Sequence, residues 1–328
     1  MLKVYGINQG RFCEGDGEHC NVLMFTNPTD EERKHLVNEL KIDEHTLSSS
    51  LDPDELSRLE FEPDHTAMII KRPKNYSAED QFVFRISSLG LFLFADKLVI
   101  VGHEDLLPFE GRHFQKISSL PDLLLKMLYR ITLHYIEHLK IINSIGDSLE
   151  NKIVTAMENR YLINLFSLEK GLTYYHNAIH SNGVLIDKLK ASSAKLGFTP
   201  ENLEYLDDLI IENNQCMKQA EIFSNIFASL MDARVSVVSN NLNVLMKTLN
   251  VITICIMVPT FVVSVFSMNV GIPMAGHPLS FWLILGISAA SSAAFMMVFR
   301  LINRRTMGRI AKPRRVRRRR FKAVEKKP

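Results

Sequence analysis

The spacing of apolar residues changes twice along the chain and divides it into three regions. Up to about residue 115, short β-branched or aromatic runs recur between polar stretches, which is typical of strands. From Ser118 onward apolar residues recur every three or four positions, which indicates long amphipathic helices. From Val251 the chain is almost continuously apolar in two runs separated by a short polar stretch. The pattern predicts an α+β domain, then long helices, then segments able to cross a membrane.

The first region is expected to contain several short strands with helices between them. Strands are expected at residues 21–25, 67–72, 82–87, 91–94 and 97–102. Only Ala95 and Asp96 separate the last two, so these should form a hairpin. Thr29 can cap the helix that follows it, and Pro53 is placed for the first turn of another helix.

Three long helices are expected in the second region. The first two cover residues 120–154 and 162–189, and a break between Gly197 and Pro200 separates them from the third. From Glu201 the chain has no Pro or Gly until Pro259, which lies inside the first strongly apolar run. A continuous helix over residues 201–266 would be about 100 Å long. Such a helix can transmit movement from a soluble domain into the membrane.

The two apolar runs are long enough to be transmembrane helices. No Lys, Arg, Asp or Glu occurs in the 52 residues from 248 to 299. Residues 279–299 would span about 31 Å as a helix, the thickness of bilayer hydrocarbon. Residues 251–266, extended by their uncharged neighbours, form another span. The intervening residues 267–278 contain two glycines and two prolines, which break helices, so the spans form a hairpin with both chain ends on one side.

Charge is distributed unevenly and sets the expected orientation. Residues 300–328 carry 14 Lys and Arg and a single acid, Glu325, whereas the rest of the chain has 25 basic and 35 acidic residues. Positive charge next to a span favours the cytoplasmic side, and Lys247 lies just before the first span. The body and the tail are therefore expected to be cytoplasmic. The run RRVRRRR at residues 314–320 fits anionic lipid head groups better than a nucleic acid, because it lies close to a membrane helix.

The third long helix carries a polar series as it approaches the first span. Asp232 and Asn243 are 11 residues apart, as are Met246 and Met257, and 11 residues is close to three helical turns. These side chains, with Thr260, are therefore expected on one side of the helix. In a single copy, the Asn and Thr groups could simply hydrogen-bond to another helix. Around the axis of several copies, the same face would line a pore.

The second span carries a stripe of small residues. Gly286, Ala290 and Ala294 recur every four residues, which lets another helix approach closely. This predicts that the second span packs against its neighbours while the first span lines the path.

These features together resemble the CorA family of magnesium transporters. The resemblance covers the whole chain: a cytoplasmic α/β domain, long helices, the segment NVLMKTLNVITICIMVPTF, two C-terminal spans and a basic tail. Its most specific mark is Met268-Asn269 after the first span, where the family carries Gly-Met-Asn preceded by an aromatic residue, here Phe266. Ser267 stands in the place of the glycine. The loop that follows lacks the acidic residues of many magnesium-transporting members and is closer to members of which some move zinc or other divalent ions.

The resemblance implies a fold, an assembly and a set of functional residues. The fold is an α+β cytoplasmic domain with long helices and two C-terminal transmembrane helices, and five copies form a homopentameric funnel. Ser267, Met268 and Asn269 form the selectivity filter, where five Asn269 side chains hold Mg²⁺ through its hydration shell by neutral oxygens. Cytoplasmic Mg²⁺ at Asp208 would bridge subunits and hold the pore closed. The pore-lining residues of the family map onto Asp232, Asn243, Met246, Met257 and Thr260.

The implied activity is passive ion transport rather than enzymatic catalysis. Moving two charges through about 100 mV releases about 4.6 kcal/mol, so no ATP is needed. Mg²⁺ is expected as the transported and regulatory ion, with Co²⁺, Ni²⁺ or Zn²⁺ as alternatives, because amide and carbonyl oxygens discriminate weakly. Anionic lipids are the expected partners of the tail, and no nucleic acid is expected.

The resemblance also implies a location and a division of the chain. The protein is expected to be a multi-pass protein of the cell inner membrane with both termini in the cytoplasm. The expected segments are residues 1–115, a cytoplasmic α/β domain; 116–199, a cytoplasmic long-helix region; 200–267, a stalk helix continuing into the first transmembrane helix; 268–278, an extracytoplasmic loop; 279–299, the second transmembrane helix; and 300–328, a basic cytoplasmic tail.

Other interpretations of the chain stay open at this point. A member that has lost conduction because of Ser267 could be a membrane-anchored ion sensor or scaffold. The motif HYIEH at residues 134–138 matches an inverted zinc-protease pattern with Glu137 as base, although the bland interpretation is two surface histidines on an amphipathic helix. Cys13, His19 and Cys20 lie close in sequence, but their spacing is not that of a known zinc site.

Overall fold

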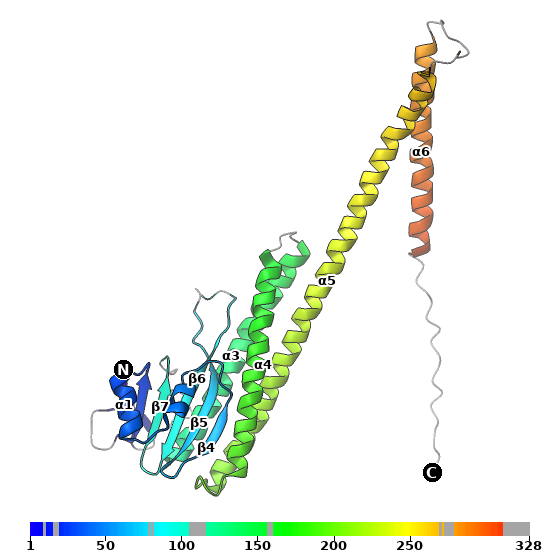
Figure 1. Cartoon of the computed structure of the whole chain (residues 1–328). Helices are drawn as coiled ribbons and strands as arrows, with labels where there is room; N and C mark the ends of the chain where they lie inside the picture. Colours follow the sequence, from blue (N-terminus) through cyan, green and yellow to red (C-terminus); the bar gives the residue numbers. More distant parts are fainter. Residues whose placement is uncertain are drawn as a thin grey trace, which may run out of the picture. The chain divides into compact units, whose positions relative to one another are not determined.

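The structure, a computed structural model, has two compact units connected by one helix (Figure 1). It describes residues 1–8, 11–15, 20–77, 80, 82–104, 116–155, 160–268, 271 and 279–310. The first unit is Met1–Val235 and the second is Ser236–Pro328. Helix α5 (Pro200–Phe266) is continuous across the boundary, as predicted from the absence of Pro and Gly before Pro259.

Seven strands of the described residues form one sheet in the first unit. Their order across the sheet is β2-β1-β3-β7-β6-β5-β4. Strands β3 and β7 are parallel, and every other neighbouring pair is antiparallel. The strands are β1 (Leu2–Asn8), β2 (Arg11–Glu14), β3 (Val22–Thr26), β4 (Arg58–Phe61), β5 (His65–Pro73), β6 (Ile86–Phe94) and β7 (Leu98–Gly102).

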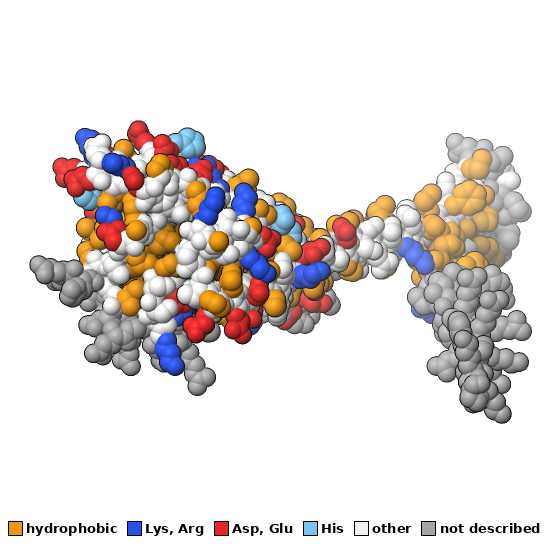
Figure 2. Space-filling view, turned by 90° about the horizontal axis from the view of Figure 1, so that it is seen from below, with side chains coloured by type: hydrophobic (Ala, Val, Ile, Leu, Met, Phe, Trp, Pro, Cys, Tyr) orange, Lys and Arg blue, Asp and Glu red, His pale blue; other side chains and the backbone are white. Residues whose placement is uncertain are grey.

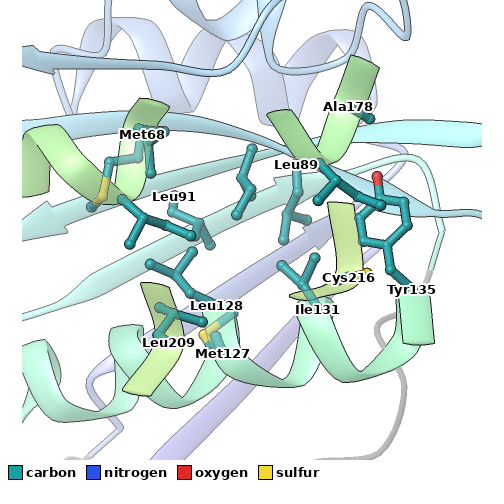
Figure 3. Packing of buried hydrophobic residues seen from close by; sticks show 14 of the residues in the cluster. Met68, Leu89, Leu91, Met127, Leu128, Ile131, Tyr135, Ala178, Leu209 and Cys216 are labelled. Atoms are coloured by element: carbon teal, nitrogen blue, oxygen red, sulfur yellow. The ribbon is translucent and has the colours of Figure 1, made fainter. Parts of the chain in front are cut away.

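Helices cover both faces of this sheet. Short helices α1 (Asp30–Asn38) and α2 (Glu44–Ser49) enclose a small core with one face, which includes Leu36, Leu47 and Phe92. On the other face, α3 (Leu120–Thr155), α4 (Arg160–Ala191) and the first half of α5 form the larger core. Figure 3 shows its centre, where side chains of β5 and β6 meet those of the three long helices. The residues labelled there are Met68, Leu89, Leu91, Met127, Leu128, Ile131, Tyr135, Ala178, Leu209 and Cys216.

Most elements expected in the first unit are present, with two corrections. The hairpin of β6 and β7 is confirmed, and Thr29 caps α1 in a capping box with Glu32. The helix expected to begin at Pro53 is wrong: the chain turns there and continues into β4, whose pairing with β5 outweighs the local helix signal. The two strands expected at residues 82–87 and 91–94 are one strand, β6, which begins only at Ile86.

The side chain of Asn182 on α4 completes the hydrogen bonding of β5. Beyond Ile69 that strand has no partner in β4, and Asn182 takes its place by accepting from the Lys71 N–H (2.9 Å) and donating to the Lys71 carbonyl (2.7 Å). Ser57 also donates to the Asn182 Oδ1 (2.7 Å). All of these groups lie at the junction of sheet and helix, so one amide fixes α4 against the sheet.

Replacing Asn182 with alanine is therefore expected to destabilise the first unit. Two buried backbone groups lose their partner at about 1–3 kcal/mol each, so the free energy of unfolding should fall by about 2–6 kcal/mol. Denaturant titration of the full chain measures this. Asn177→Ala, an exposed amide on the same helix, is the matched control and should change it by less than about 0.5 kcal/mol. Equal effects of the two variants would contradict the assignment.

The second unit contains the end of α5 and helix α6 (Ser280–Ile310), which contact each other. Two segments are long and apolar enough to cross a membrane, one within α5 and one at Ser280–Ile302. In Figure 2 charged side chains spread over the first unit, while the coloured surface of the second unit is mainly hydrophobic. Both expected spans are thus helices of suitable length and composition.

The contact between the two spans uses a polar residue that the sequence pattern did not single out. The Ser288 hydroxyl donates to the Pro259 carbonyl (3.4 Å), and Ser288 is only 6% exposed. Gly286 takes no part in this contact, because a Cβ added there would meet no atom of the chain within 4 Å, so its packing against another copy stays a prediction.

Candidate ion-conduction path

The five predicted pore-lining residues all lie on α5, and all are exposed within the single chain. Because α5 is one uninterrupted helix, their spacing places them within an arc of about 100° over about 42 Å of its length. Met246 and Met257 are 57% and 62% exposed, which leaves them free to face other copies of the helix. The exposed residues of this series are Asp232, Asn243, Met246, Met257 and Thr260.

The hydroxyl of Thr260 is oriented by its own helix. It donates to the Ile256 carbonyl at 2.7 Å. With the proton engaged in this bond, the lone pairs of the Thr260 oxygen remain available as acceptors. Acceptors of this kind can hold the water shell of a hydrated divalent cation.

Helix α5 ends at the predicted filter, and the structure shows the local geometry of Ser267. Its N–H and its hydroxyl both donate to the Ser264 carbonyl, at 3.2 and 2.9 Å. Among the described non-glycine residues only Asn27 and Lys41 have positive φ, so the backbone at Ser267 is not left-handed. Met268 is 59% exposed. Asn269 lies outside the described residues.

The predicted regulatory residue Asp208 lies on the part of α5 that belongs to the first unit. It is exposed and forms no ion pair with any residue that the structure describes. Its neighbour Asp207 instead pairs with Lys190 of α4. Of these two adjacent carboxylates, Asp207 is therefore paired within the chain and Asp208 is not paired with any described residue.

The HYIEH motif on α3 forms part of the core rather than a catalytic site. His134 and His138 are 6% and 4% exposed, so their interpretation as surface histidines is wrong. Their ring centroids are 4.3 Å apart, and His138 Nδ1 lies 2.7 Å from the Tyr175 hydroxyl. Glu137 is half exposed and pairs with Arg130 at 3.0 Å. The described residues contain no group of three or more potential metal ligands, and His19 of the cysteine-flanked cluster lies outside them.

Burial lowers the pKa of both rings. The pKa of His134 falls from 6.5 to about 3, through burial and then the nearby positive charges of His138, Arg130 and Arg72. Burial lowers the pKa of His138 to about 4, partly opposed by Glu137. Both rings are therefore neutral at physiological pH, as packing in the core requires.

Acid is accordingly expected to destabilise the first unit. Below pH 6.5 the unfolded chain binds protons at these histidines and the folded chain does not, so stability is full above about 6.5 and is lost as pH falls toward 4 and then 3. Each ring steepens the fall by up to about 1.4 kcal/mol per pH unit. Denaturant titrations of the full chain at several pH values measure the slope, which should be shallower for His134→Phe. An unchanged slope in that variant would contradict the assignment.

The fold and this path define a class of protein: a membrane transport protein in which a helix of a soluble α+β unit continues into the first of two spans. A family model described as CorA-like Mg²⁺ transporter protein matches residues 18–305. The cobalt/magnesium transport protein CorA of Methanocaldococcus jannaschii is 26% identical over 284 residues, which are 83% of this chain and 87% of that protein.

Solved structures have the same fold. The complete structure of the CorA magnesium transporter from Methanocaldococcus jannaschii matches with a TM-score of 0.76 and 21% identity, over 92% of this chain and 97% of that one. The full-length CmaX protein matches with a TM-score of 0.66 and 17% identity, over 91% and 97%. The chain belongs to the CorA-like Mg²⁺ transporter family, and it is a divalent-cation transporter rather than an enzyme.

Proposed function

We propose that five copies of the chain form a passive Mg²⁺ channel with α5 around the axis. The observation that supports this proposal is the continuity of α5, which holds Asp232, Asn243, Met246, Met257 and Thr260 on one exposed arc of the helix. The helix ends at Phe266, directly before the proposed Ser267-Met268-Asn269 filter in the sequence. Neutral oxygens suit Mg²⁺, which releases its water reluctantly and passes with its hydration shell. The membrane potential supplies the driving force.

The orientation and regulation follow the same scheme. The protein lies in the cell inner membrane with both termini in the cytoplasm, where its basic tail meets anionic lipids. Cytoplasmic Mg²⁺ binds at Asp208 between subunits and stabilises the closed pore. When the ion leaves, acidic domains of neighbouring subunits repel each other and the pore opens.

Replacing Ser267 with glycine is expected to leave transport almost unchanged. A left-handed backbone at this position would cost serine about 1–2 kcal/mol relative to glycine, but the backbone of Ser267 is not left-handed. Serine can therefore replace glycine here as a small residue. The Mg²⁺ flux of Ser267→Gly into liposomes should stay within about twofold of the flux of the unaltered chain. A tenfold rise in flux on Ser267→Gly would contradict this and support a member whose conduction is impaired by serine.

A panel of ions in proteoliposomes tests the proposed selectivity. Purified protein is reconstituted, and uptake of Mg²⁺, Co²⁺, Ni²⁺ and Zn²⁺ is followed at equal membrane potential. Uptake of Mg²⁺ at a rate equal to or above that of the others is expected. Uptake of Zn²⁺ without Mg²⁺ would identify a zinc-selective member instead, and the absence of any flux would favour an ion sensor or scaffold.

A further inference from the structure

A cavity of about 990 Å³ opens in the first unit between α4 and the chain that leads into β6. Small-molecule sites typically have volumes of about 300–1,000 Å³, with apolar walls and a few charged groups. This cavity combines exposed aromatic side chains with Lys and Arg, and nothing in ion conduction uses it. We propose that it binds a nucleoside phosphate.

The wall formed by α4 presents two aromatic rings with a lysine between them. Phe166, Lys170 and Tyr174 are spaced four residues apart and so lie on one face of the helix. Phe166 is 53% exposed and Tyr174 is 45% exposed. Because a flat nucleobase stacks on exposed aromatic rings, this face fits the base, and Lys170 lies within reach of its phosphates.

A glycine brings the two walls together. A Cβ at Gly171 would lie 3.3 Å from both the Cβ and the carbonyl oxygen of Phe84, which is tighter than ordinary contact. The absence of a side chain therefore lets α4 approach the chain before β6 and close the floor of the cavity. Phe84 itself is buried and stacks on Tyr76, with ring centroids 4.6 Å apart, so this floor is firmly packed.

The opposite wall holds two cations that face each other. The Lys74 N–H donates to the Arg85 carbonyl (2.9 Å). The last residues paired in the ladder of β5 and β6 are Pro73 and Ile86, so Lys74 and Arg85 are opposite each other one position further on. Like charges at directly opposite positions of an antiparallel pair are unfavourable. Glu104 pairs with Lys74 and with Arg72, each at 3.2 Å, and forms no ion pair with Arg85.

Arg85 and Lys170 form no ion pair with a carboxylate among the described residues, although Asp80 interacts electrostatically with Arg85. Asp54 lies on the lining, and Asp80 lies in a smaller adjoining cavity, where its carboxylate accepts from the Ser77 N–H and hydroxyl at 2.8 Å each. Several cationic side chains converging on one anion, with Arg among them, are the usual means of binding phosphate groups. The aromatic rings of this cavity add a second preference, for a ligand that carries a flat organic group as well as phosphate.

Calorimetric binding of ATP to the full chain in detergent tests the proposal. EDTA is present, so that Mg²⁺ binding does not contribute. We expect saturable binding with a Kd below about 1 mM. Arg85→Gln and Lys170→Gln should each weaken it by about tenfold, because each removes a charged hydrogen-bond donor. Lys188→Gln, an exposed lysine elsewhere on α4, is the matched control and should bind ATP as the unaltered chain does.

Two further ligands separate the parts of the proposal. Pyrophosphate and adenosine should each bind at least about tenfold more weakly than ATP, since each lacks one half of the recognised groups. Hydrogen exchange should slow on ATP binding at residues 83–87 and 166–174. No saturable ATP binding, pyrophosphate binding as tight as that of ATP, or an equal loss in Lys188→Gln would overturn the proposal. None of these measurements involves flux, so its failure is independent of the failure of the proposed channel.

Discussion

Replacing Asn269 with alanine is expected to reduce Mg²⁺ flux by about fiftyfold or more. In the proposed pentamer, five amide oxygens accept hydrogen bonds from the water shell of the entering ion. A hydrogen bond contributes about 0.5–1.5 kcal/mol net, so the loss of five weakens ion capture by at least about 2.5 kcal/mol. Initial rates of Mg²⁺ uptake into proteoliposomes measure this effect.

A matched variant distinguishes the filter from general damage to α5. Asn241→Ala removes an amide from the same helix. Asn241 is two residues from Asn243, which places it about 200° away from the face proposed to line the pore. This variant should conduct as the unaltered chain does. Both variants should keep the same oligomeric mass in detergent. Flux that survives Asn269→Ala at more than about half of the original rate would exclude Asn269 as the entrance ring.

Replacing Asp208 with alanine is expected to relieve inhibition by internal Mg²⁺. If Mg²⁺ at this carboxylate bridges subunits, the bound ion stabilises the closed state. Removing the carboxylate removes that stabilisation. Allosteric couplings of this kind usually amount to about 5–150-fold. The internal Mg²⁺ concentration that halves uptake should therefore rise by at least about fivefold. Vesicles loaded with graded Mg²⁺ measure this shift.

The neighbouring carboxylate provides the control for Asp208. Asp207→Ala removes the same charge one residue away, but Asp207 is already paired with Lys190 within the chain. The inhibitory concentration should stay unchanged in this variant. If the two variants shift the inhibitory Mg²⁺ concentration equally, the shift comes from the loss of one negative charge in this region and not from a site at Asp208. If neither shifts it, Asp208 is not the regulatory site.

The long helices and spans could be predicted from the sequence because their signals are strong and local. The amphipathic period of α3 and α4 and the absence of Pro and Gly from most of α5 determine those elements almost by themselves. The sheet was harder to predict. Strands β1 and β2 were not foreseen, although Val4, Tyr5 and Ile7 are typical strand residues, because each strand is stabilised mainly by pairing with a distant neighbour.

The candidate site was predictable to a different degree at each residue. The face shared by Asn243, Met246 and Met257 follows from helical spacing alone. Asp208 and Asn269 could be named only through the family resemblance, because a single exposed Asp or Asn has no pattern of its own. The bond from Ser288 to Pro259 and the buried state of His134 needed the structure, since both depend on which helix faces meet.

The central claim is that the chain by itself conducts Mg²⁺ down the membrane potential. The most direct test is Mg²⁺ uptake by ATP-free proteoliposomes containing only this protein, with an imposed potential that is negative on the side toward which Mg²⁺ moves. Two charges moving through 100 mV gain about 4.6 kcal/mol, so uptake should accelerate with the potential and stop when the Mg²⁺ gradient balances it. Uptake no faster than in protein-free vesicles, from reconstituted and pentameric protein, would contradict the account.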